Sequence, residues 1–206
     1  MKKLLLAAAT ALFCLLAGCG DSAPPAAAVK KEVAPPEPVK GRSALYSMYG
    51  AARSWAADAQ VLELHSIHLP EVKSERGKAA AWQATFVSPQ AGRSRTYTYS
   101  VIEAEGNLHK GVFAGQDEGW SGPRGTQKPF LIAAVKTDSD EVFETALKKA
   151  GDYEKKSPNK GISFVLEQTS RYPDAVWRVI WGESVGTSDF SIVVDASTGV
   201  YQQTLR

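Results

Sequence analysis

Residues 79–88 read Ala-Ala-Ala-Trp-Gln-Ala-Thr-Phe-Val-Ser, and this stretch decides the fold class. Apolar residues recur at every second position, at Ala80, Trp82, Ala84 and Phe86, which is the pattern of a β-strand with one face in a core. The segment ends at a polar turn, and the alternation resumes afterwards. Further strands are expected on both sides, over residues 61–69, 95–104 and 108–114. The region therefore predicts an antiparallel β-meander.

A helix is expected immediately before this meander. Ser43 is a candidate N-cap because its hydroxyl can accept a hydrogen bond from a free backbone N–H of the first turn. Apolar residues then recur at a spacing of three to four, at Leu45, Met48, Ala52, Trp55 and Ala59. This spacing is typical of a helix that packs one face against a sheet.

The second half of the chain repeats this order. Asp138 and Glu141 have the spacing of a capping box, and Gly151 is a natural helix stop. Between them, Val142, Ala146, Leu147 and Ala150 form an apolar stripe. Three alternating segments follow, around Phe164, Trp177 and Ile192. We therefore expect a second helix followed by a second meander.

Three pairs of landmarks support a duplication. Trp82 and Trp177 lie 95 residues apart, Gly106 and Gly199 lie 93 apart, and Tyr46 and Phe143 lie 97 apart. A near-constant offset in matching structural order indicates an internal repeat. The prediction is an α+β protein of two similar units, residues 43–115 and 138–206, joined by a connector over 116–137. Because small units without disulfides bury little surface alone, we expect them to pack together.

Three segments of the second unit are characteristic: the helix end at 146–151, the strand at 176–179 and the terminal Ile-Val-Val-Asp-Ala-Ser-Thr-Gly at 192–199. In these segments the unit resembles PepSY-type domains, which are small modules of the bacterial envelope. The first unit has Val-Ile-Glu-Ala-Glu-Gly at 101–106 and lacks the Thr-Gly pair, so its resemblance rests on the order of elements. The resemblance implies envelope regulation or inhibition of peptidases and no catalytic residues.

The N-terminal segment has the features of a bacterial lipoprotein signal. Lys2 and Lys3 precede an apolar run over 4–16, and Leu16-Ala17-Gly18-Cys19 resembles a lipobox. We interpret residues 1–18 as a signal peptide and Cys19 as the lipidated N-terminus of the mature chain, anchored in the membrane. A plain signal peptide or an N-terminal membrane anchor is the alternative. Gly20 at the next position favours the outer membrane, facing the periplasm, if the source has two membranes.

Residues 19–42 are expected to form a disordered tether. Five of the eleven prolines fall between residues 20 and 42, among alanines and without an aromatic residue. Such a composition buries too little apolar surface to offset the entropy of ordering. The simplest interpretation is a spacer that holds the folded part away from the bilayer.

Charge and cysteine content exclude several chemistries. Without Lys2 and Lys3 the chain carries 22 basic and 22 acidic residues, so the dense positive charge of a nonspecific nucleic-acid binder is absent. Cys14 lies in the signal peptide and Cys19 carries the lipid, so no thiol is left for a nucleophile, a disulfide or a thiolate metal site. We expect no cofactor and no nucleic-acid partner.

Two further motifs resemble a catalytic site and a metal site but have simpler structural explanations. Gly182–Gly186 matches the Gly-x-Ser-x-Gly pattern of hydrolases, but a strand rather than a helix is expected after it, so a hairpin loop is the better interpretation. His65 and His68 lie three apart in an expected strand, where they point to opposite faces. We therefore expect no metal site.

The loop Gly119–Gly125 is the most unusual segment of the connector. Its glycine amides, with Arg124 and Lys128, offer an anion site, and Trp120 offers a ring for stacking. The alternative is a passive connector in which Trp120 fills the joint between the two units. These three residues are the candidate ligand-binding residues, and no catalytic residue is predicted.

The sequence as a whole favours a membrane-anchored, noncatalytic binding or regulatory module. Its partner would be another envelope protein or a peptide, bound at a sheet edge or in a groove between the units. Two alternatives stay open: a cell-envelope hydrolase whose site is assembled only by folding, and a structural spacer. Two carboxylates that converge in a cleft would favour the hydrolase.

The lipobox leads to a direct prediction. Mass spectrometry of the protein isolated from cell membranes should show a chain that begins at Cys19 and carries fatty acyl groups. An unmodified chain that still contains residues 1–18 and resides in the cytosol would contradict both the anchor and the envelope location.

Overall fold

The computed structural model describes residues 35–157 and 160–206. The predicted signal peptide, Cys19 and the tether up to residue 34 lie outside the described residues. Within them, the first repeat consists of α1 (Gly41–Trp55), β2 (Gln60–Ile67), β4 (Ala81–Ser88), β5 (Arg93–Ser100) and β6 (Gly111–Gly119). The second consists of α2 (Ser139–Ala150), α3 (Asp152–Lys156), β8 (Ile162–Thr169), β9 (Tyr172–Trp181), β10 (Ser191–Asp195) and β11 (Tyr201–Leu205).

Short elements complete the chain. The two-residue strands β1 (Val39–Lys40) and β3 (Lys78–Ala79) pair with each other. Between the repeats lie β7 (Gln127–Lys128), which pairs with β8, and a 3₁₀ turn at Ile132–Ala134. None of the helices in the described part of the chain is both long and apolar enough to span a membrane.

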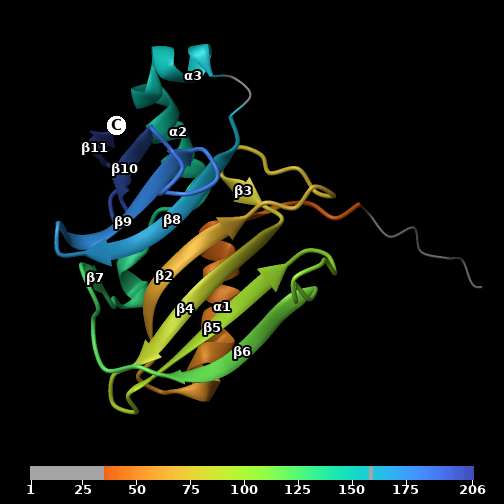
Figure 1. The fold of residues 1–206 in the computed structure, drawn as a ribbon, viewed down its shortest axis with the longest axis vertical. Helices are drawn as coiled ribbons and strands as arrows, with labels where there is room; N and C mark the ends of the chain where they lie inside the picture. The colour runs from red at the N-terminus through yellow and green to blue at the C-terminus, as the bar shows by residue number, and fades with distance from the viewer. Residues whose placement is uncertain (1–34, 158–159) are drawn as a thin grey trace, which may run out of the picture. The chain divides into compact units, whose positions relative to one another are not determined.

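The two repeats share one antiparallel sheet of nine strands. Its main order is β11-β10-β9-β8-β2-β4-β5-β6, so the first strands of the two repeats, β2 and β8, pair at the centre with Leu64 opposite Leu166. The order reads outward from this pair in the same way on both sides (Figure 1). The predicted fold class is confirmed: each unit packs one long helix on an antiparallel meander, the second unit adds the short α3, and the two meanders are continuous.

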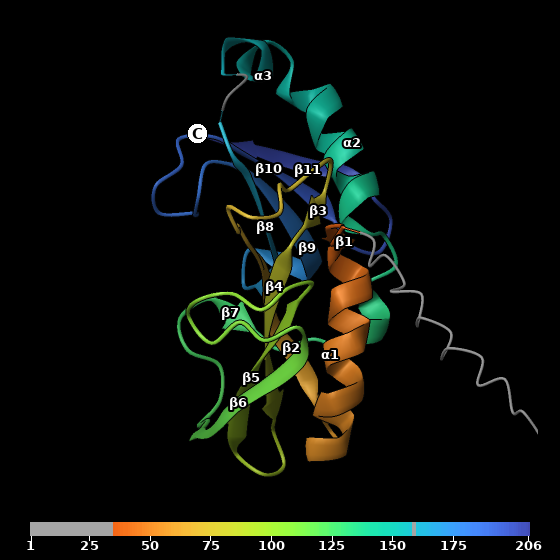
Figure 2. The ribbon, with the colours of Figure 1, turned by 90° about the vertical axis from the view of Figure 1, so that its right-hand side faces the viewer.

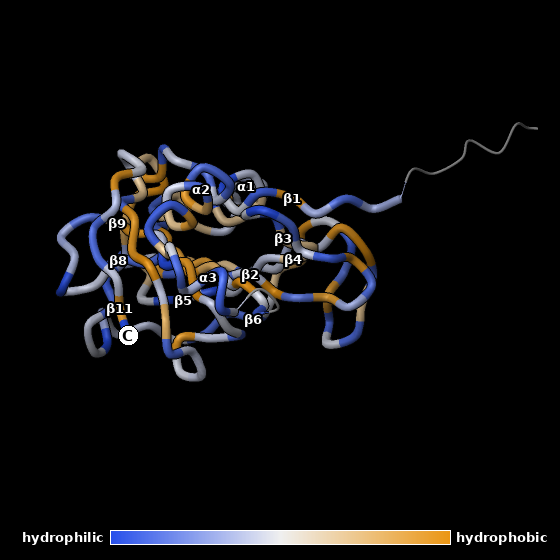
Figure 3. Tube along the Cα trace, turned by 90° about the horizontal axis from the view of Figure 1, so that it is seen from above, coloured by the Kyte–Doolittle hydropathy of each residue, from blue (hydrophilic) through white to orange (hydrophobic). Residues whose placement is uncertain are grey.

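Both long helices cover the same face of the sheet (Figure 2). The predicted stripe of α1 is buried at Leu45, Met48 and Ala52, and that of α2 at Val142 and Ala146. In Figure 3, hydrophobic stretches of the strands lie beneath α1 and α2. The residues of both helices and both meanders belong to one continuous core.

Trp82 and Trp177 occupy equivalent places in this core. Both rings are fully buried, and they meet edge to face with centroids 6.3 Å apart. The indole N–H of Trp82 donates to the carbonyl of Val39, and that of Trp177 donates to the carbonyl of Thr137. Each acceptor lies two residues before the helix of its own repeat. Each tryptophan therefore fixes the entry of its helix onto the sheet.

The two helices begin side by side, which corrects the predicted start of α1. The helix begins at Gly41 rather than after Ser43, and the preceding Lys40 makes no side-chain cap. The second repeat supplies the cap: Ser139 Oγ accepts from the Gly41 N–H at 2.7 Å, and Asp138 Oδ1 accepts from the Arg42 N–H at 2.9 Å. Ordered structure thus extends into the expected tether over 39–42, because these residues pair with β3 and with α2.

Asp138 is the N-cap of α2, as predicted, but the cap differs in detail. Its carboxylate accepts from the Ser139 N–H at 2.7 Å as well as from Arg42. Among the described residues no hydrogen bond joins the Glu141 side chain to Asp138, so the reciprocal half of the capping box is missing. The Asp138 carboxylate caps two helices instead of one.

Other differences concern strand limits and the connector. The edge strand predicted over 108–114 lies at 111–119, and α3 and β11 were not predicted. In the connector, Phe130, Ile132 and Val135 enter the core, and the backbone of Phe130 exchanges hydrogen bonds of 2.9 and 2.8 Å with Val61. Trp120 is half-buried, and its backbone N–H donates to the carbonyl of Gly92. Phe130, not Trp120, therefore fills the joint between the units.

Gly41 and Gly50 in α1 provide a matched pair of alanine substitutions. A Cβ at Gly41 would lie 2.8 Å from the rings of both Trp82 and Trp177, whereas a Cβ at Gly50 would meet nothing within 4 Å. We expect Gly41→Ala to lower the free energy of unfolding by about 1–3 kcal/mol through overpacking. Gly50→Ala should raise it by roughly 0.5–1 kcal/mol through helix propensity. Urea denaturation checks both, and equal effects would contradict the tight tryptophan contact.

Candidate functional site

The two repeats differ most in the connection between their first and second strands. The second repeat joins β8 to β9 through only Ser170 and Arg171, whereas the first joins β2 to β4 through residues 68–80, which include β3. We call residues 68–80 the insertion loop. Insertions into one copy of a repeat map to loops, and loops on a rigid scaffold commonly carry function. The insertion loop is therefore the first place to look for a site.

The insertion loop is anchored to the start of α2. Ser139 Oγ donates a hydrogen bond of 2.5 Å to the carbonyl of Gly77. Gly77 has a φ of +84°, and a Cβ on it would lie 2.4 Å from the Ser139 carbonyl oxygen, so only glycine fits there. The next residue toward the N-terminus, Arg76, forms an ion pair with Glu144 of α2. These contacts hold the second half of the loop on the helix.

His68 anchors the first half of the loop to β8. Its Nε2 lies 2.9 Å from Ser163 Oγ and its Nδ1 lies 3.2 Å from Ser74 Oγ. The Ser163 hydroxyl donates to the carbonyls of Gly182 and Glu183, so it accepts from His68 Nε2–H. Ser74 then donates to the free Nδ1 of a neutral ring. Desolvation lowers the pKa of His68, in agreement with a neutral imidazole at pH 7.

A cavity of about 640 Å³ lies between the insertion loop, α2 and the start of β8. This volume falls within the usual range of ligand sites. The floor is apolar and consists of Leu69, Pro70, Phe143, Ile162 and Phe164. The rim carries four cationic side chains and one carboxylate, from Lys73, Arg76, Lys78, Lys160 and Glu75. We call this space the insertion cavity.

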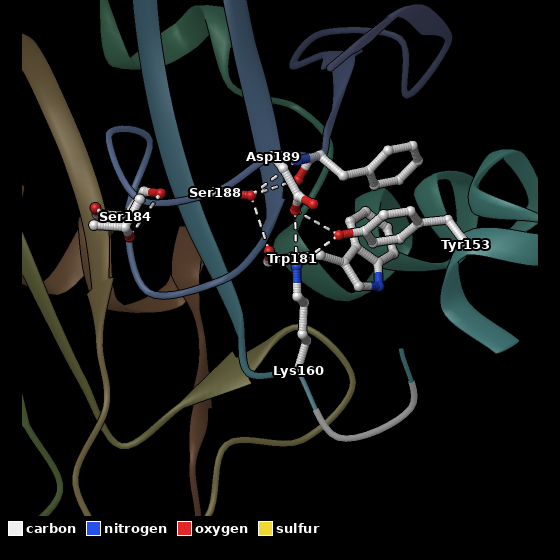
Figure 4. A network of polar contacts seen from close by, with 8 residues as sticks. Tyr153, Lys160, Trp181, Ser184, Ser188 and Asp189 are labelled. Carbon is white, nitrogen blue, oxygen red and sulfur yellow. Dashed lines mark hydrogen bonds and ion pairs between the residues drawn. The ribbon is translucent and has the colours of Figure 1, made fainter. Parts of the chain in front are cut away.

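Lys160 on this rim belongs to a fixed network (Figure 4). Its ammonium donates to Asp189 at 2.7 Å and to the Tyr153 hydroxyl at 2.8 Å, and Tyr153 donates to Asp189 at 2.6 Å. The hydrogen bond from Lys160, followed by that from Tyr153, lowers the pKa of Asp189 to about 2. The Tyr153 ring stacks on Phe190 with centroids 4.0 Å apart. The network therefore ties α3 to the β9–β10 hairpin.

Lys73 and Lys78, the two other lysines on the rim, differ from Lys160 in their charge partners. Lys160 is paired with Asp189 and Arg76 with Glu144, but Lys73 and Lys78 form no ion pair within residues 35–157 and 160–206. Both lysines are exposed at the cavity mouth. Their charges are the ones available to a ligand.

A second group of titratable side chains lies on the sheet face opposite the helices. Glu63 of β2 and Glu167 of β8 are direct cross-strand partners next to the buried pair Leu64 and Leu166. Glu63 is held by Gln127 Nε2 at 2.6 Å and lies 3.3 Å from His65 Nδ1, and the hydrogen bond with His65 lowers its pKa. Burial, together with the charge of Glu63, raises the pKa of Glu167. The two carboxyl groups thus differ in acidity.

The three predicted ligand-binding residues are not gathered into one site. Trp120 lies at the end of β6 beside the β4–β5 turn, whereas Lys128 lies in β7 opposite Gln168 of β8. Arg124 is exposed between them. No hydrogen bond or ion pair joins these three side chains in the described structure, and none of them lines the insertion cavity. Their role in ligand binding stays a prediction.

The other sequence motifs occupy structural positions. Gly182–Gly186 lies in the hairpin loop between β9 and β10, and no helix follows it, as expected. His65 contacts Glu63, whereas His68 contacts Ser74 and Ser163. Among residues 35–157 and 160–206, no three His, Cys, Asp or Glu side chains are arranged to hold a metal ion. The insertion cavity was missed from the sequence, although the unequal connections between repeats were a usable signal.

Comparisons with known proteins add little to this description. No family model matches the chain, so the resemblance to PepSY-type domains rests on the residues quoted above. No curated protein matches it either. A solved structure of a candidate lipoprotein from Clostridium difficile 630 superposes with a TM-score of 0.48 and 12% sequence identity, over 78% of this chain and 91% of that one. Similarity at this level supports no conclusion about function.

Glu167 provides a test of the opposite sheet face. Because its pKa is raised in the folded protein, ionisation costs stability there, and the cost appears as the pH rises from about 4 through the raised pKa. At pH 7 we expect Glu167→Gln to stabilise the protein by roughly 0.5 kcal/mol, the size of a like-charge cross-strand effect. The gain should shrink toward pH 4.

Chemical denaturation at pH 4 and pH 7 measures this effect. Glu118→Gln, an exposed position on β6, serves as the control and should leave stability nearly unchanged at both pH values. A Glu167→Gln effect of the same size at both pH values would show that the charge of Glu167 is not its cause.

Proposed function

We propose that this chain is a lipid-anchored protein of the bacterial envelope that acts as a noncatalytic binding module. In this proposal the insertion cavity binds a segment of another envelope component. The anchor and the site are supported by separate observations, one from the sequence and one from the structure.

The anchor is supported by the N-terminal sequence. Lys2 and Lys3, the apolar run, and Leu16-Ala17-Gly18-Cys19 together match a lipoprotein signal, and a proline-rich stretch follows before the fold begins. The order of signal, spacer and folded unit suits a module displayed at a membrane surface. The resemblance of the second repeat to PepSY-type domains agrees with an envelope role that involves other proteins or peptides.

The observation that carries the binding proposal is the preformed insertion cavity. The loop that creates it is present in one repeat and absent from the other, so the cavity is not needed to complete the shared fold. Gly77, Arg76 and His68 hold the loop at three points. A site that is already ordered loses little conformational entropy on binding, which favours affinity.

A hydrolase is the second candidate because of Glu63 and Glu167. Two carboxyl groups whose pKa values shift in opposite directions are the usual basis of general acid–base catalysis. Neither residue lines the insertion cavity, and Gln127 and His65 already occupy the Glu63 carboxylate. The binding module is therefore the better supported of the two.

Site-specific photocrosslinking in cells tests the proposal. The full-length protein would carry p-benzoylphenylalanine at Leu69, which lines the cavity, or at Leu131, which is 64% exposed and lies outside the cavity. We expect a reproducible crosslinked partner from position 69 that is absent from position 131, identified by mass spectrometry of the joined peptides.

Two other results would contradict the proposal. If neither position yields a reproducible product, the spacer alternative is favoured. If the purified full-length protein releases soluble fragments from isolated cell walls, and Glu167→Gln abolishes the release while position 69 yields no product, the hydrolase is favoured.

A further inference from the structure

We infer that the insertion cavity recognises an acidic peptide segment, with one apolar side chain on the cavity floor and neighbouring carboxylates at Lys73 and Lys78. This inference rests on the proposed binding function and names the chemical class of its ligand. Three features of the cavity support it: its free charges, its floor and the charges that surround it.

The free charges at the mouth are positive. Arg76 and Lys160 are neutralised by Glu144 and Asp189, whereas Lys73 and Lys78 form no ion pair in the described structure. Glu75 is the one carboxylate on the rim. With two free lysines against one glutamate, the mouth favours an anionic group and disfavours a cationic one.

The floor requires an apolar group beside that anion. Phe143 and Phe164 are 8% and 3% exposed, and their rings meet edge to face with centroids 6.3 Å apart. Ile162, Leu69 and Pro70 complete the apolar part of the cavity lining. Burial of a leucine-sized or phenylalanine-sized side chain there would remove apolar surface from water and so favour binding. A purely ionic ligand would leave this surface in contact with water.

The surrounding charges favour a narrow peptide over a membrane surface. Two neighbouring hollows that Lys78 also lines carry further carboxylates: Glu37 and Glu71 in one and Glu141 in the other, besides Asp140 and Glu144, which are paired with Lys40 and Arg76. A flat anionic bilayer would meet these carboxylates together with the lysines, and the repulsion would offset the attraction. An extended segment reaches Lys73 and Lys78 without covering the flanking acidic residues.

Labelled model peptides test this inference on the full-length, detergent-solubilised protein. The probes are fluorescein-Gly-Asp-Leu-Asp-Phe-Asp-Gly-amide and the matched peptide in which every Asp is Asn, so that only charge differs. We expect the acidic peptide to bind roughly ten-fold more tightly by fluorescence anisotropy at low salt, as two charge-assisted contacts allow. The preference should decrease as salt is added.

Matched variants locate the preference. The double variant Lys73→Gln with Lys78→Gln should reduce the preference for the acidic peptide to about two-fold or less, the level of nonspecific contacts. Lys148→Gln, an exposed lysine of α2 outside the cavity, should leave it unchanged. Thermal unfolding of each variant establishes that the fold is retained.

The outcomes separate this inference from the proposed function. If position 69 crosslinks a partner but the two peptides bind equally, or the acidic peptide does not bind, the ligand class is wrong and the binding module stands. If the protein instead binds phosphatidylglycerol vesicles in a way that the double variant abolishes, a membrane surface replaces the peptide. If position 69 yields no partner, the proposed function fails together with this inference.

Discussion

The start of α1 packs so closely on the rings of Trp82 and Trp177 that a Cβ at Gly41 would lie 2.8 Å from both of them. One indole comes from each repeat, and each also holds the chain just before its own helix. Around this point, Ser139 and Asp138 cap the first turn of α1, so the start of α1 is completed by the other repeat. The sheet continues across the same boundary through β2 and β8. The two repeats are therefore halves of one core.

The two repeats have the same order of strands, so the places where they differ point to features beyond the shared fold. Corresponding strands lie in matching order on both sides of the central pair, so the features that break the match are additions to the shared fold. The insertion loop over residues 68–80 is the largest of these, and α3 is another. Both additions lie near the start of β8, where Lys160 follows α3 and His68 begins the loop. The insertion cavity thus lies between the insertion loop of the first repeat and residues of α2 and β8 in the second.

The two long helices and most strands could be predicted from the sequence because the spacing of apolar residues is a local property of the chain. Leu45, Met48 and Ala52 share one helical face whatever lies beneath them, and Trp82, Ala84 and Phe86 share one strand face. Contacts between distant residues leave no such pattern. The cap on Gly41 comes from a residue 98 positions away, and Phe130 enters the core at Val61 without any periodic signal. Closeness in the sequence likewise does not predict closeness in the fold: Trp120 lies beside the β4–β5 turn, whereas Lys128 lies in β7 against β8.

The α+β class could be assigned from the amino-acid sequence, which also predicts an internal duplication and a lipoprotein signal, because composition, period and short motifs can be recognised within short stretches of the chain. Three features could be seen only in the tertiary structure: the two meanders share one sheet, Asp138 caps two helices, and a cavity lies under the insertion loop. Each of these depends on pairs such as His68 with Ser163 and Gly77 with Ser139, which are far apart along the chain. Their proximity follows from packing of the whole core, and no local pattern encodes it.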